Sequence, residues 1–582
     1  MIKKIIILLC LIIFNLGSIY GVKIINVPLV KDDATQQLQQ AIDEASRYEN
    51  EKVVIKLSPG VYNISRNQAS KNIYYISNTA SQKENPDPTK HIGLWFKNMK
   101  NITFDGNGAT LLTHGEMTSF VLDNCKNILL KNFQLDAADP SVAEILIVNR
   151  DDKTIEFEVI YPSKFEVVDG SFNFVGEGWK FGDNQKNSDH IEFAQIFDAQ
   201  NNTTFRVPSP LKHYKKAVKT GENSVLLQFE SAPKVYPGER YQLRHGIRNE
   251  ACMFINECQD IKLSDISFYF MGNFGIVSQF SENLEFERLL CQPNPETERT
   301  NAGFADFLQF SSCKGLIQVK KSKFNGSQDD PINIHGTHLA VDSIISPKKI
   351  IIAYKNPQTF GFMPFKPGDE VGFTDCSTLN YVGDVASVAD INQINPYKYE
   401  LELDREILNA DFDFPNRNYV VENLSYTPDV IISENYFGRT PARGVLISTR
   451  GKSIIEKNIF NGIPMASILV ADDASSWYES GPVSDLTIRE NKFINCSLPT
   501  ILISPEIKEF NRPVHSNIII ESNTFSPTGE NTIIVEASTG VKIKDNVFNS
   551  PGNDKRDISD MIKTVDVDNC SIQGNSVTSS PI

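Results

Sequence analysis

Apolar and polar residues alternate along most of this chain, and in its last third each alternating run ends in the same short pattern. An apolar run is followed by Asn, by one further residue, and then by Phe or Val. The pattern occurs six times, at Asn435, Asn458, Asn491, Asn523, Asn546 and Asn575. The steps between these asparagines are 23, 33, 32, 23 and 29 residues. Alternation with a period of two predicts β-strands, and repeats of this length are typical of the coils of a β-solenoid.

The same alternation is found in earlier parts of the chain. It covers residues 101–112, 127–135, 260–268, 283–291 and 315–324. We expect Asn at the turn of a coil because it tolerates left-handed backbone angles, and because its amide can hydrogen-bond to its copy in the next coil. We therefore interpret these asparagines as structural and not as catalytic.

The residues before the first coil have a different period. Leu38, Ala41, Ile42 and Ala45 recur at helical spacing and are followed by a strand-like run. This pattern predicts an amphipathic helix, which would cover the otherwise open first coil.

Two long stretches, residues 140–246 and 338–425, lack the repeated pattern. Each contains alternating strands and a related Pro-Gly turn, at Pro237 and at Pro367. We predict two copies of a small β-barrel, each inserted into a loop of the solenoid, where insertions often wall the binding face. The remaining segments are then a cap with the first coils over 22–139, coils over 247–337 and C-terminal coils over 426–582.

The first 21 residues resemble a leader for export. Lys3 and Lys4 precede an apolar run from residue 5 to 14, and small residues follow around Gly17. This is typical of a secretory signal peptide, and the run is short for a membrane span. We expect an exported protein, periplasmic, at the cell surface or secreted; the alternative is a buried first strand.

Composition and charge narrow the range of partners. The chain has 582 residues, of which 40% are hydrophobic and 22% charged, and its formal net charge is −15. No basic patch alternates with aromatic residues, so we expect neither nucleic acid nor a membrane as a partner. Because an acidic protein repels a polyanionic glycan, the charge favours a neutral sugar.

Eight cysteines remain after the leader: Cys125, Cys252, Cys258, Cys291, Cys313, Cys376, Cys496 and Cys570. None has the CxxC spacing of a zinc site, and most lie in strand-like runs. We favour mostly free, buried thiols over disulfides, and we expect no metal and no cofactor.

The candidate catalytic residues are Asp306, Asp329 and Asp330. The step from Asp306 to Asp329 is 23 residues, equal to the shortest coil, so these residues should lie on neighbouring coils about 4.8 Å apart. Carboxyl groups this close raise one another's pKa, so that one can stay protonated as an acid while another acts as a base. The spacing does not choose between inversion and retention. Alternatively, one of the adjacent pair only caps a turn before Pro331, since neighbouring strand residues point to opposite faces.

Six further residues are candidates for binding a sugar. Asn333 and His335 follow the aspartates, and the others are Arg443, Arg450, Trp477 and Glu479. A Trp in a polar loop can stack on the apolar face of a sugar, while Arg and Glu can bind its hydroxyl groups. The alternatives are surface ion pairs and a packed aromatic ring. His335 and His338 could equally satisfy the backbone of a coil.

The order of Asp, Asp-Asp and then His-Gly resembles the pattern of polygalacturonases, although the flanking residues differ and the basic motif of that family is not evident. The segments ADFLQF, SQDDPINIHGTH, PARGVLISTRG and DDASSWYESGPV more closely resemble glycoside hydrolase family 110. Its members are exported α-1,3-galactosidases, best known from gut Bacteroides, that remove terminal galactose from blood group B antigens. The resemblance extends over nearly the whole chain after the leader.

This resemblance implies an inverting, metal-independent hydrolysis in which Asp306, Asp329 and Asp330 supply the acid and the base. Our hypothesis for the division of roles is that Asp329 is the general acid, while Asp306 and Asp330 position and deprotonate the water; the residues themselves leave open which Asp is the acid and which the base. The expected fold class is all-β, a right-handed parallel β-helix of the pectate-lyase type with a capping helix and two barrel insertions. The expected function is exo-acting α-1,3-galactosidase. The alternatives are a polygalacturonase-like enzyme, a calcium-dependent lyase or a non-catalytic glycan-binding solenoid. A choice between branched and linear substrates does not follow from the residues, and an end coil or insertion could mediate a homodimer.

Overall fold

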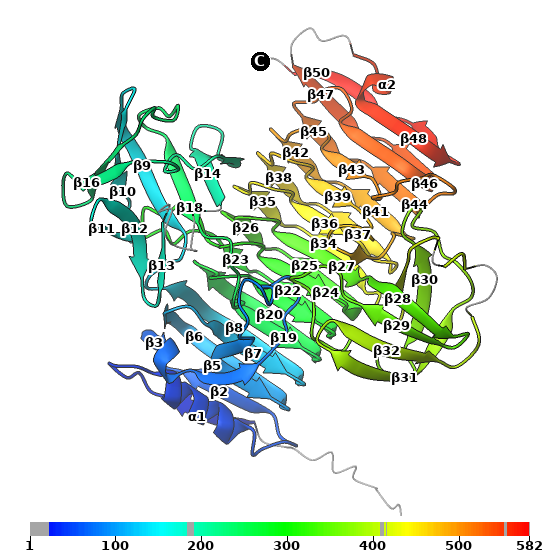
Figure 1. Cartoon of the computed structure of the whole chain (residues 1–582), viewed down its shortest axis with the longest axis horizontal. Coiled ribbons are helices and arrows are strands. Elements are labelled where there is room, and N and C mark those ends of the chain that lie inside the picture. Colours follow the sequence, from blue (N-terminus) through cyan, green and yellow to red (C-terminus); the bar gives the residue numbers. More distant parts are fainter. Residues whose placement is uncertain are drawn as a thin grey trace, which may run out of the picture.

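A computed structural model describes residues 22–182, 191, 193–407, 412–414, 416–551 and 556–580. The predicted signal peptide lies outside the described residues. The body of the protein is a right-handed parallel β-helix, which runs from the blue N-terminal end to the red C-terminal end of Figure 1. The strands of successive coils pair in parallel and form three sheets along the stack.

The first sheet contains β1 (Lys23–Val27), β2 (Val53–Leu57), β6 (Lys100–His114), β8 (Lys126–Ala137), β20 (Gln259–Phe268), β22 (Glu282–Glu287), β25 (Lys314–Lys320), β34 (Asp429–Ser433), β37 (Ser453–Glu456), β41 (Leu486–Arg489), β44 (His515–Glu521), β46 (Ile533–Lys544) and β49 (Ser571–Gln573). The second contains β3 (Val61–Ser65), the later parts of β6, β8 and β20, then β23 (Leu290–Cys291), β26 (Lys323–Asn325), β35 (Tyr436–Gly438), β38 (Ile459–Asn461), β42 (Lys492–Ile494), β45 (Thr524–Ser526), β47 (Val547–Pro551) and β50 (Ser576–Ser580).

The third sheet carries the residues that matter most below. It contains β5 (Thr89–Lys97), β7 (Thr118–Asp123), β19 (Met253–Asn256), β21 (Ile276–Gln279), β24 (Leu308–Ser311), β27 (Ile332–Thr337), β36 (Val445–Ile447), β39 (Ile468–Val470), β43 (Ile501–Ile503), the start of β46, and β48 (Ile562–Asp568). The short strand β4 (Ser70–Ile73) pairs antiparallel with β5. A 3-10 turn, η1 (Arg66–Gln68), and a short helix, α2 (Ile558–Met561), complete the body.

The predicted capping helix is confirmed as α1 (Thr35–Ala45). Its buried side chains include Leu38, Ala41, Ile42 and Ala45, the four residues that the helical period selected. These side chains join the hydrophobic core of the coils. The helix therefore closes the first coil at the blue end of Figure 1.

The repeated Asn-x-Phe pattern forms two ladders inside the C-terminal coils. The rings of Phe437, Phe460, Phe493, Phe525 and Phe548 stack with centroid distances of 4.7, 5.0, 4.8 and 5.0 Å. Each asparagine amide donates to the Oδ1 of the next, for example Asn435 to Asn458 at 3.1 Å and Asn458 to Asn491 at 3.0 Å. The ladders account for the strict repetition of these two residue types.

One detail of the turn differs from the expectation. In the late coils the left-handed residue is the one before the ladder asparagine, such as Glu434 or Lys457, and not the asparagine itself. In the early coils Asn101 and Asn127 do adopt left-handed angles. The ladder asparagines are therefore selected by their amide hydrogen bonds and not by their backbone angles.

The two insertions have different architectures and flank the β-helix on opposite sides in Figure 1. The second is a closed barrel of β28 (Leu339–Ser346), β29 (Lys349–Ala353), β32 (Lys398–Leu403), β31 (Ala386–Asn395), β30 (Glu370–Asp375) and β33 (Tyr419–Asn423). In the described part of the first insertion, seven strands form a sheet in the order β15 (Thr203–Val207), β14 (Phe193–Asp198), β18 (Arg240–Arg244), β9 (Ala143–Arg150), β10 (Thr154–Val159), β17 (Ser224–Gln228) and β16 (Lys216–Lys219). A small sheet of β11 (Lys164–Val168), β12 (Ser171–Gly176) and β13 (Trp179–Phe181) shares its core. Both insertions contain a Pro-Gly turn whose glycine, Gly238 or Gly368, has a positive φ angle.

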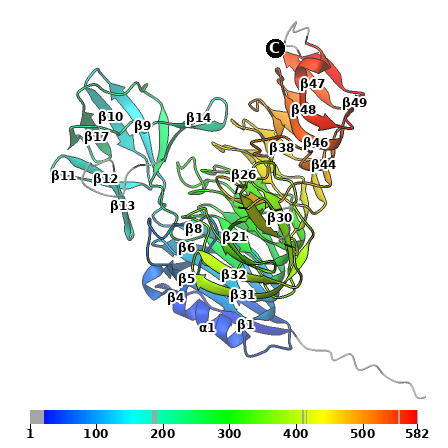
Figure 2. The same cartoon turned by 45° about the vertical axis from the view of Figure 1, so that its right-hand side comes forward.

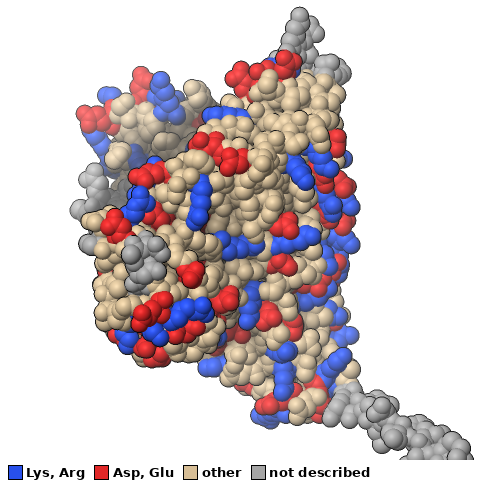
Figure 3. Space-filling model, turned by 90° about the vertical axis from the view of Figure 1, so that its right-hand side faces the viewer, with Lys and Arg blue, Asp and Glu red and all other residues tan. Residues whose placement is uncertain are grey.

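The surface and the cysteines agree with the composition. On the face shown in Figure 3, basic and acidic side chains are interspersed over the coils. All eight cysteines after the leader are free thiols, and five of them are buried. Within the described ranges, no helix has the length and apolarity that a membrane crossing requires.

Candidate active site

The three predicted aspartates line one cavity of about 250 Å³, which we call the aspartate pocket. Asp306 lies just before β24, and Asp330 lies just before β27 in the next coil. Leu308 pairs with Ile332, so the local step is 24 residues and Asp306 corresponds to Asp330, not to Asp329. The expected convergence is present, with its register shifted by one residue.

Asp329 and Asp330 both face the pocket although they are adjacent. The strand alternation that would send them to opposite faces does not apply, because both lie in the turn between β26 and β27. Arg443 corresponds to Asp330 in the following coil and donates its backbone N–H to Asp330 Oδ1 at 2.8 Å. Its guanidinium Nη1 lies 3.3 Å from Asp330 Oδ2. Asp329 Oδ1 is paired instead with Nη2 of Arg206, at 2.9 Å.

The environment places protons on the two buried aspartates. Burial raises the pKa of Asp306 well above its ordinary value, the charges of Asp329 and Asp330 raise it further, and only Arg248 opposes them. Burial also raises the pKa of Asp330 to about 7, even though Arg443 acts against the shift. Carboxyl groups that interact this closely titrate together, so Asp306 and Asp330 share protons that isolated aspartates would have lost.

Glu479 lies in the wall of the pocket, where its carboxylate binds two neighbouring asparagine side chains. It belongs to β40 (Glu479–Ser480), which pairs antiparallel with the end of β27. Its Oε1 accepts hydrogen bonds from the side-chain amides of Asn78, at 3.0 Å, and Asn333, at 3.4 Å. Asn333 and Glu479, two of the candidate sugar-binding residues, are therefore in contact, and Asn78 is a further partner of Glu479.

Trp477 lies at the rim of the pocket and is 46% exposed. The loop that carries it is built around Asp473, whose carboxylate accepts the backbone N–H groups of Ser475, Ser476 and Trp477. Burial alone would raise the pKa of Asp473, but these N–H groups hold it below its ordinary value. A fixed, exposed indole beside a polar cavity offers a flat apolar surface to a sugar ring.

Two predicted binding residues lie outside the pocket. Arg450 is half-buried at the joint between coil and barrel, where Nη2 lies 2.7 Å from Glu422 Oε2 and the guanidinium stacks on Tyr381 at 4.1 Å. His335 is buried behind the wall: its Nδ1 lies 2.7 Å from the carbonyl of Gly336, and its Nε2 lies 3.5 Å from Glu479. His335 thus supports Glu479, and Arg450 is structural.

His338, the other histidine that could have bound a sugar, is also buried. Its Nε2 lies 3.0 Å from Asp472 Oδ1. This placement favours the alternative in which the histidines of the coil serve the structure.

Several lining residues were not predicted from the sequence: Asn78, Arg206, Arg248, Leu446, Ser448, Leu469, Ala471, Asp473 and Glu506. Leu446 and Leu469 follow Asn333 in consecutive coils of the third sheet, so the repeat could have identified them. Asn78, Arg206 and Arg248 come from connections outside the repeat, where no periodic signal exists.

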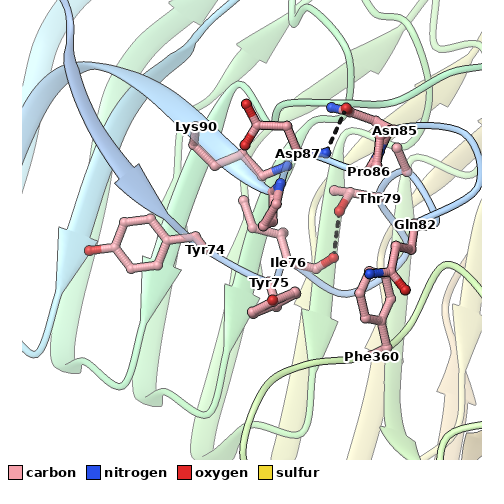
Figure 4. A pocket seen from close by; sticks show the side chains of 12 residues that line it. Tyr74, Tyr75, Ile76, Thr79, Gln82, Asn85, Pro86, Asp87, Lys90 and Phe360 are labelled. Carbon is pink, nitrogen blue, oxygen red and sulfur yellow. Dashed lines mark hydrogen bonds between the residues drawn. The ribbon is translucent and has the colours of Figure 1, made fainter. Parts of the chain in front are cut away.

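Among the described residues, no side chain of the barrel lines the aspartate pocket. Two side chains that do line the pocket, Asn78 and Arg248, form hydrogen bonds with the second insertion. Thr359 donates to Asn78 Oδ1 at 2.6 Å, and Arg248 donates to Gln358 at 2.7 Å. In Figure 4, Phe360 of the second insertion and residues of the segment 74–90, Tyr75 among them, line a small cavity that is separate from the aspartate pocket. The ring centroids of Tyr75 and Phe360 are 5.3 Å apart. Of the two insertions that we expected to frame the pocket, the first supplies a lining side chain, Arg206, and the second supports side chains that other segments supply.

No cluster of three His, Cys, Asp or Glu side chains suited to a metal ion occurs in the described part of the chain. The pocket instead combines clustered carboxyl groups, three arginines and an exposed indole. Such a set of groups defines the class of site that glycosidic bond hydrolysis requires.

Comparison with known proteins agrees with this class. The chain is 41% identical over 544 residues to the α-1,3-galactosidase A of Bacteroides thetaiotaomicron, with 93% of this chain and 94% of that protein covered. It is 34% identical to the α-1,3-galactosidase A of Streptomyces avermitilis, with 88% and 84% covered. Residues 349–409 match the family model described as GLAA-B beta-barrel domain II. A solved family 28 exopolygalacturonase of Yersinia enterocolitica aligns with a TM-score of 0.41 and 11% identity, covering 95% of this chain and 79% of that one.

The chain belongs to the α-1,3-galactosidase family, glycoside hydrolase family 110.

Proposed function

We propose that this protein is an exo-acting α-1,3-galactosidase that releases terminal galactose from blood group B-type glycans. The observation that carries the proposal is the convergence of Asp306, Asp329 and Asp330 from adjacent coils on one pocket with an exposed Trp477. The family relationship supplies the sugar and the linkage. A pocket of about 250 Å³ is small for a ligand site, which suits a terminal sugar unit better than the middle of a polymer.

The chemistry needs one protonated and one ionised carboxyl group. The acid protonates the glycosidic oxygen as its bond to the anomeric carbon breaks, and the base removes a proton from the water that attacks that carbon from the opposite face. The product is then galactose of inverted, β configuration. The aspartate trio supports this division of labour because burial keeps a proton on Asp306 or Asp330 while Arg206 stabilises a negative charge on Asp329.

One step of the mechanism inferred from the sequence, proton donation by Asp329, depends on the ion pair that this residue forms. Asp329 can donate the proton only if its ion pair with Arg206 opens when the substrate is bound. Donation from Asp330 or Asp306 would leave that pair closed. Both versions use the same trio and give the same inverted product.

The direct test is an Asp329→Asn variant assayed with a Galα1-3Gal substrate and with its fucosylated, branched form. The amide keeps the shape but carries no acid or base, and we expect galactose release to fall by about 10²–10⁴-fold with an unchanged circular dichroism spectrum. Full activity of the variant would contradict the assignment. Binding of either glycan by the wild type without galactose release would identify a lectin-like solenoid instead.

We also propose that the protein is exported after removal of residues 1–21, on the strength of the leader sequence. Mass spectrometry of the mature protein from its native cell should find an N-terminus near residue 22. Sedimentation of the same material would decide between a monomer and the homodimer that an exposed end coil or insertion could form.

A further inference from the structure

Arg206 is the only lining residue of the aspartate pocket that the first insertion supplies, within the ranges described. It lies on β15, the edge strand of the seven-stranded sheet. The repeat does not place it there, since the insertion interrupts the coils between β8 and β19. Something outside the coils must therefore hold Arg206 at 2.9 Å from Asp329.

The hairpin of β14 and β15 is fastened to coils that follow the aspartates. Arg439 donates to Asn202 Oδ1 at 2.6 Å, and its guanidinium stacks on Phe197 at 4.7 Å. Asn202 also donates to the Tyr436 hydroxyl at 3.4 Å, and Thr203 donates to the carbonyl of Gly462. In Figure 2 the β14 hairpin reaches from the first insertion toward β26 and β38. Contacts at the hairpin turn thus fix the strand that carries Arg206.

The charges around the trio give Arg206 a specific electrostatic role. The charged groups that face the three aspartates in the pocket are Arg206, Arg248, Arg443, Asp473, Glu479 and Glu506, with His335 behind Glu479. Arg443 is committed to Asp330 and Arg248 is tied to Gln358. Among the described residues, only Arg206 forms an ion pair with Asp329, and its charge also lowers the pKa of Asp330.

We propose that Arg206 is a positioning residue through which the first insertion sets the proton distribution of the trio. While Arg206 is paired with Asp329, its positive charge lies beside the trio and opposes protonation of the neighbouring Asp330. This inference rests on the proposed hydrolase function and adds to it the residue that tunes the acid and the base. The insertion is then a part of the catalytic machinery and not only a wall.

The test is the pH dependence of kcat/KM for the wild type, Arg206→Gln and Arg206→Lys on one α-1,3-galactoside. Loss of the positive charge should raise the pKa of Asp330, so the Gln profile moves to higher pH by about 1 unit. On the acidic limb this shift corresponds to about a tenfold loss of kcat/KM at fixed pH. Lys should restore most of the original profile. Arg288→Gln, which breaks a surface Arg–Asp pair of the coils, is the matched control and should leave the profile unchanged.

A second variant tests the fastening without touching Arg206. Asn202→Ala combined with Thr203→Val removes the hydrogen bonds of the hairpin turn and should shift the profile in the same direction, by less. Identical profiles for the wild type and Arg206→Gln, or for the Gln and Lys variants, would overturn the inference. A wild type that releases no galactose would instead overturn the proposed function. Circular dichroism of each variant excludes misfolding as the cause of a change.

Discussion

The C-terminal coils and the coils of the aspartate pocket are built from the same repeat, yet they use it differently. Between Asn435 and Asn575 the two ladder positions repeat, so that phenylalanine stacks on phenylalanine and asparagine bonds to asparagine. At the pocket, the coils supply the aspartates and Arg443 in the turns before β24, β27 and β36, and segments outside the repeat supply Arg206 and Arg248. Repetition provides a rigid support, and the departures from repetition provide the chemistry.

This comparison predicts opposite consequences for substitutions in the two regions. Changes in the ladder should lower stability and leave kcat unchanged, whereas changes in the pocket should impair kcat or KM without lowering stability. Three variants test the contrast, beginning with the largest expected effect.

Asp330→Asn should abolish most activity without destabilising the protein at neutral pH. Because the folded pKa of Asp330 is raised to about 7, the folded state binds a proton that the unfolded state has lost above its ordinary pKa of 3.8. Stability of the wild type therefore falls as the pH rises from about 4 to about 7, and this loss should be absent from the variant. We expect a fall in kcat of about 10²–10⁴-fold and a higher melting temperature than the wild type at pH 8.

Thermal unfolding of both proteins at pH 4 and pH 8 measures this difference. A variant that melts below the wild type at pH 8 would show that the Asp330 carboxylate is ionised and stabilising in the folded pocket. That result would contradict the account of shared protons.

Phe493→Ala should destabilise the protein while the surviving folded fraction keeps its kcat. The ring is buried between Phe460 and Phe525, at 5.0 and 4.8 Å, so its removal leaves a cavity in the stack. Such truncations cost about 3–5 kcal/mol of unfolding free energy. Denaturant titration with Phe493→Leu as the milder control measures the loss; a comparable fall in kcat under native conditions would break the separation of the two regions.

Trp477→Ala should produce the smallest effect, confined to substrate binding. Loss of the stacking surface should raise KM by about tenfold, with little change in unfolding free energy because the residue is half exposed. Trp477→Phe keeps an aromatic face and should recover part of the loss. An unchanged KM in the Ala variant would remove Trp477 from the proposed sugar site.

The same contrast explains how far the sequence could predict the structure. Period-two alternation and the Asn-x-Phe pattern predicted the solenoid and the strands from β34 onward, because buried ladders require the same residue in each coil. The helical spacing of Leu38 and Ile42 predicted α1, because the side chains that a helix buries must recur on one of its faces.

The aspartates were found because they obey the repeat to within one residue, at a step of 24 and not 23. Arg206, Arg248 and Asn78 were missed because they lie in connections whose path depends on tertiary contacts such as those of Asn202 with Tyr436. We predicted that Arg450 binds the sugar because of its charge, but its guanidinium is already paired with the buried carboxylate of Glu422. Periodicity predicts what faces the core of a solenoid, and it is silent about which side chains from elsewhere reach its surface.

The central claim is that three carboxyl groups from neighbouring coils act on one glycosidic bond through an attacking water. Proton NMR of the first turnovers on an α-1,3-galactoside tests it most directly, because the anomeric signal of the released sugar reports the direction of attack. The account predicts β-galactose first, followed by slow appearance of the α anomer as the sugar mutarotates. Initial release of α-galactose would require a covalent intermediate and would contradict it.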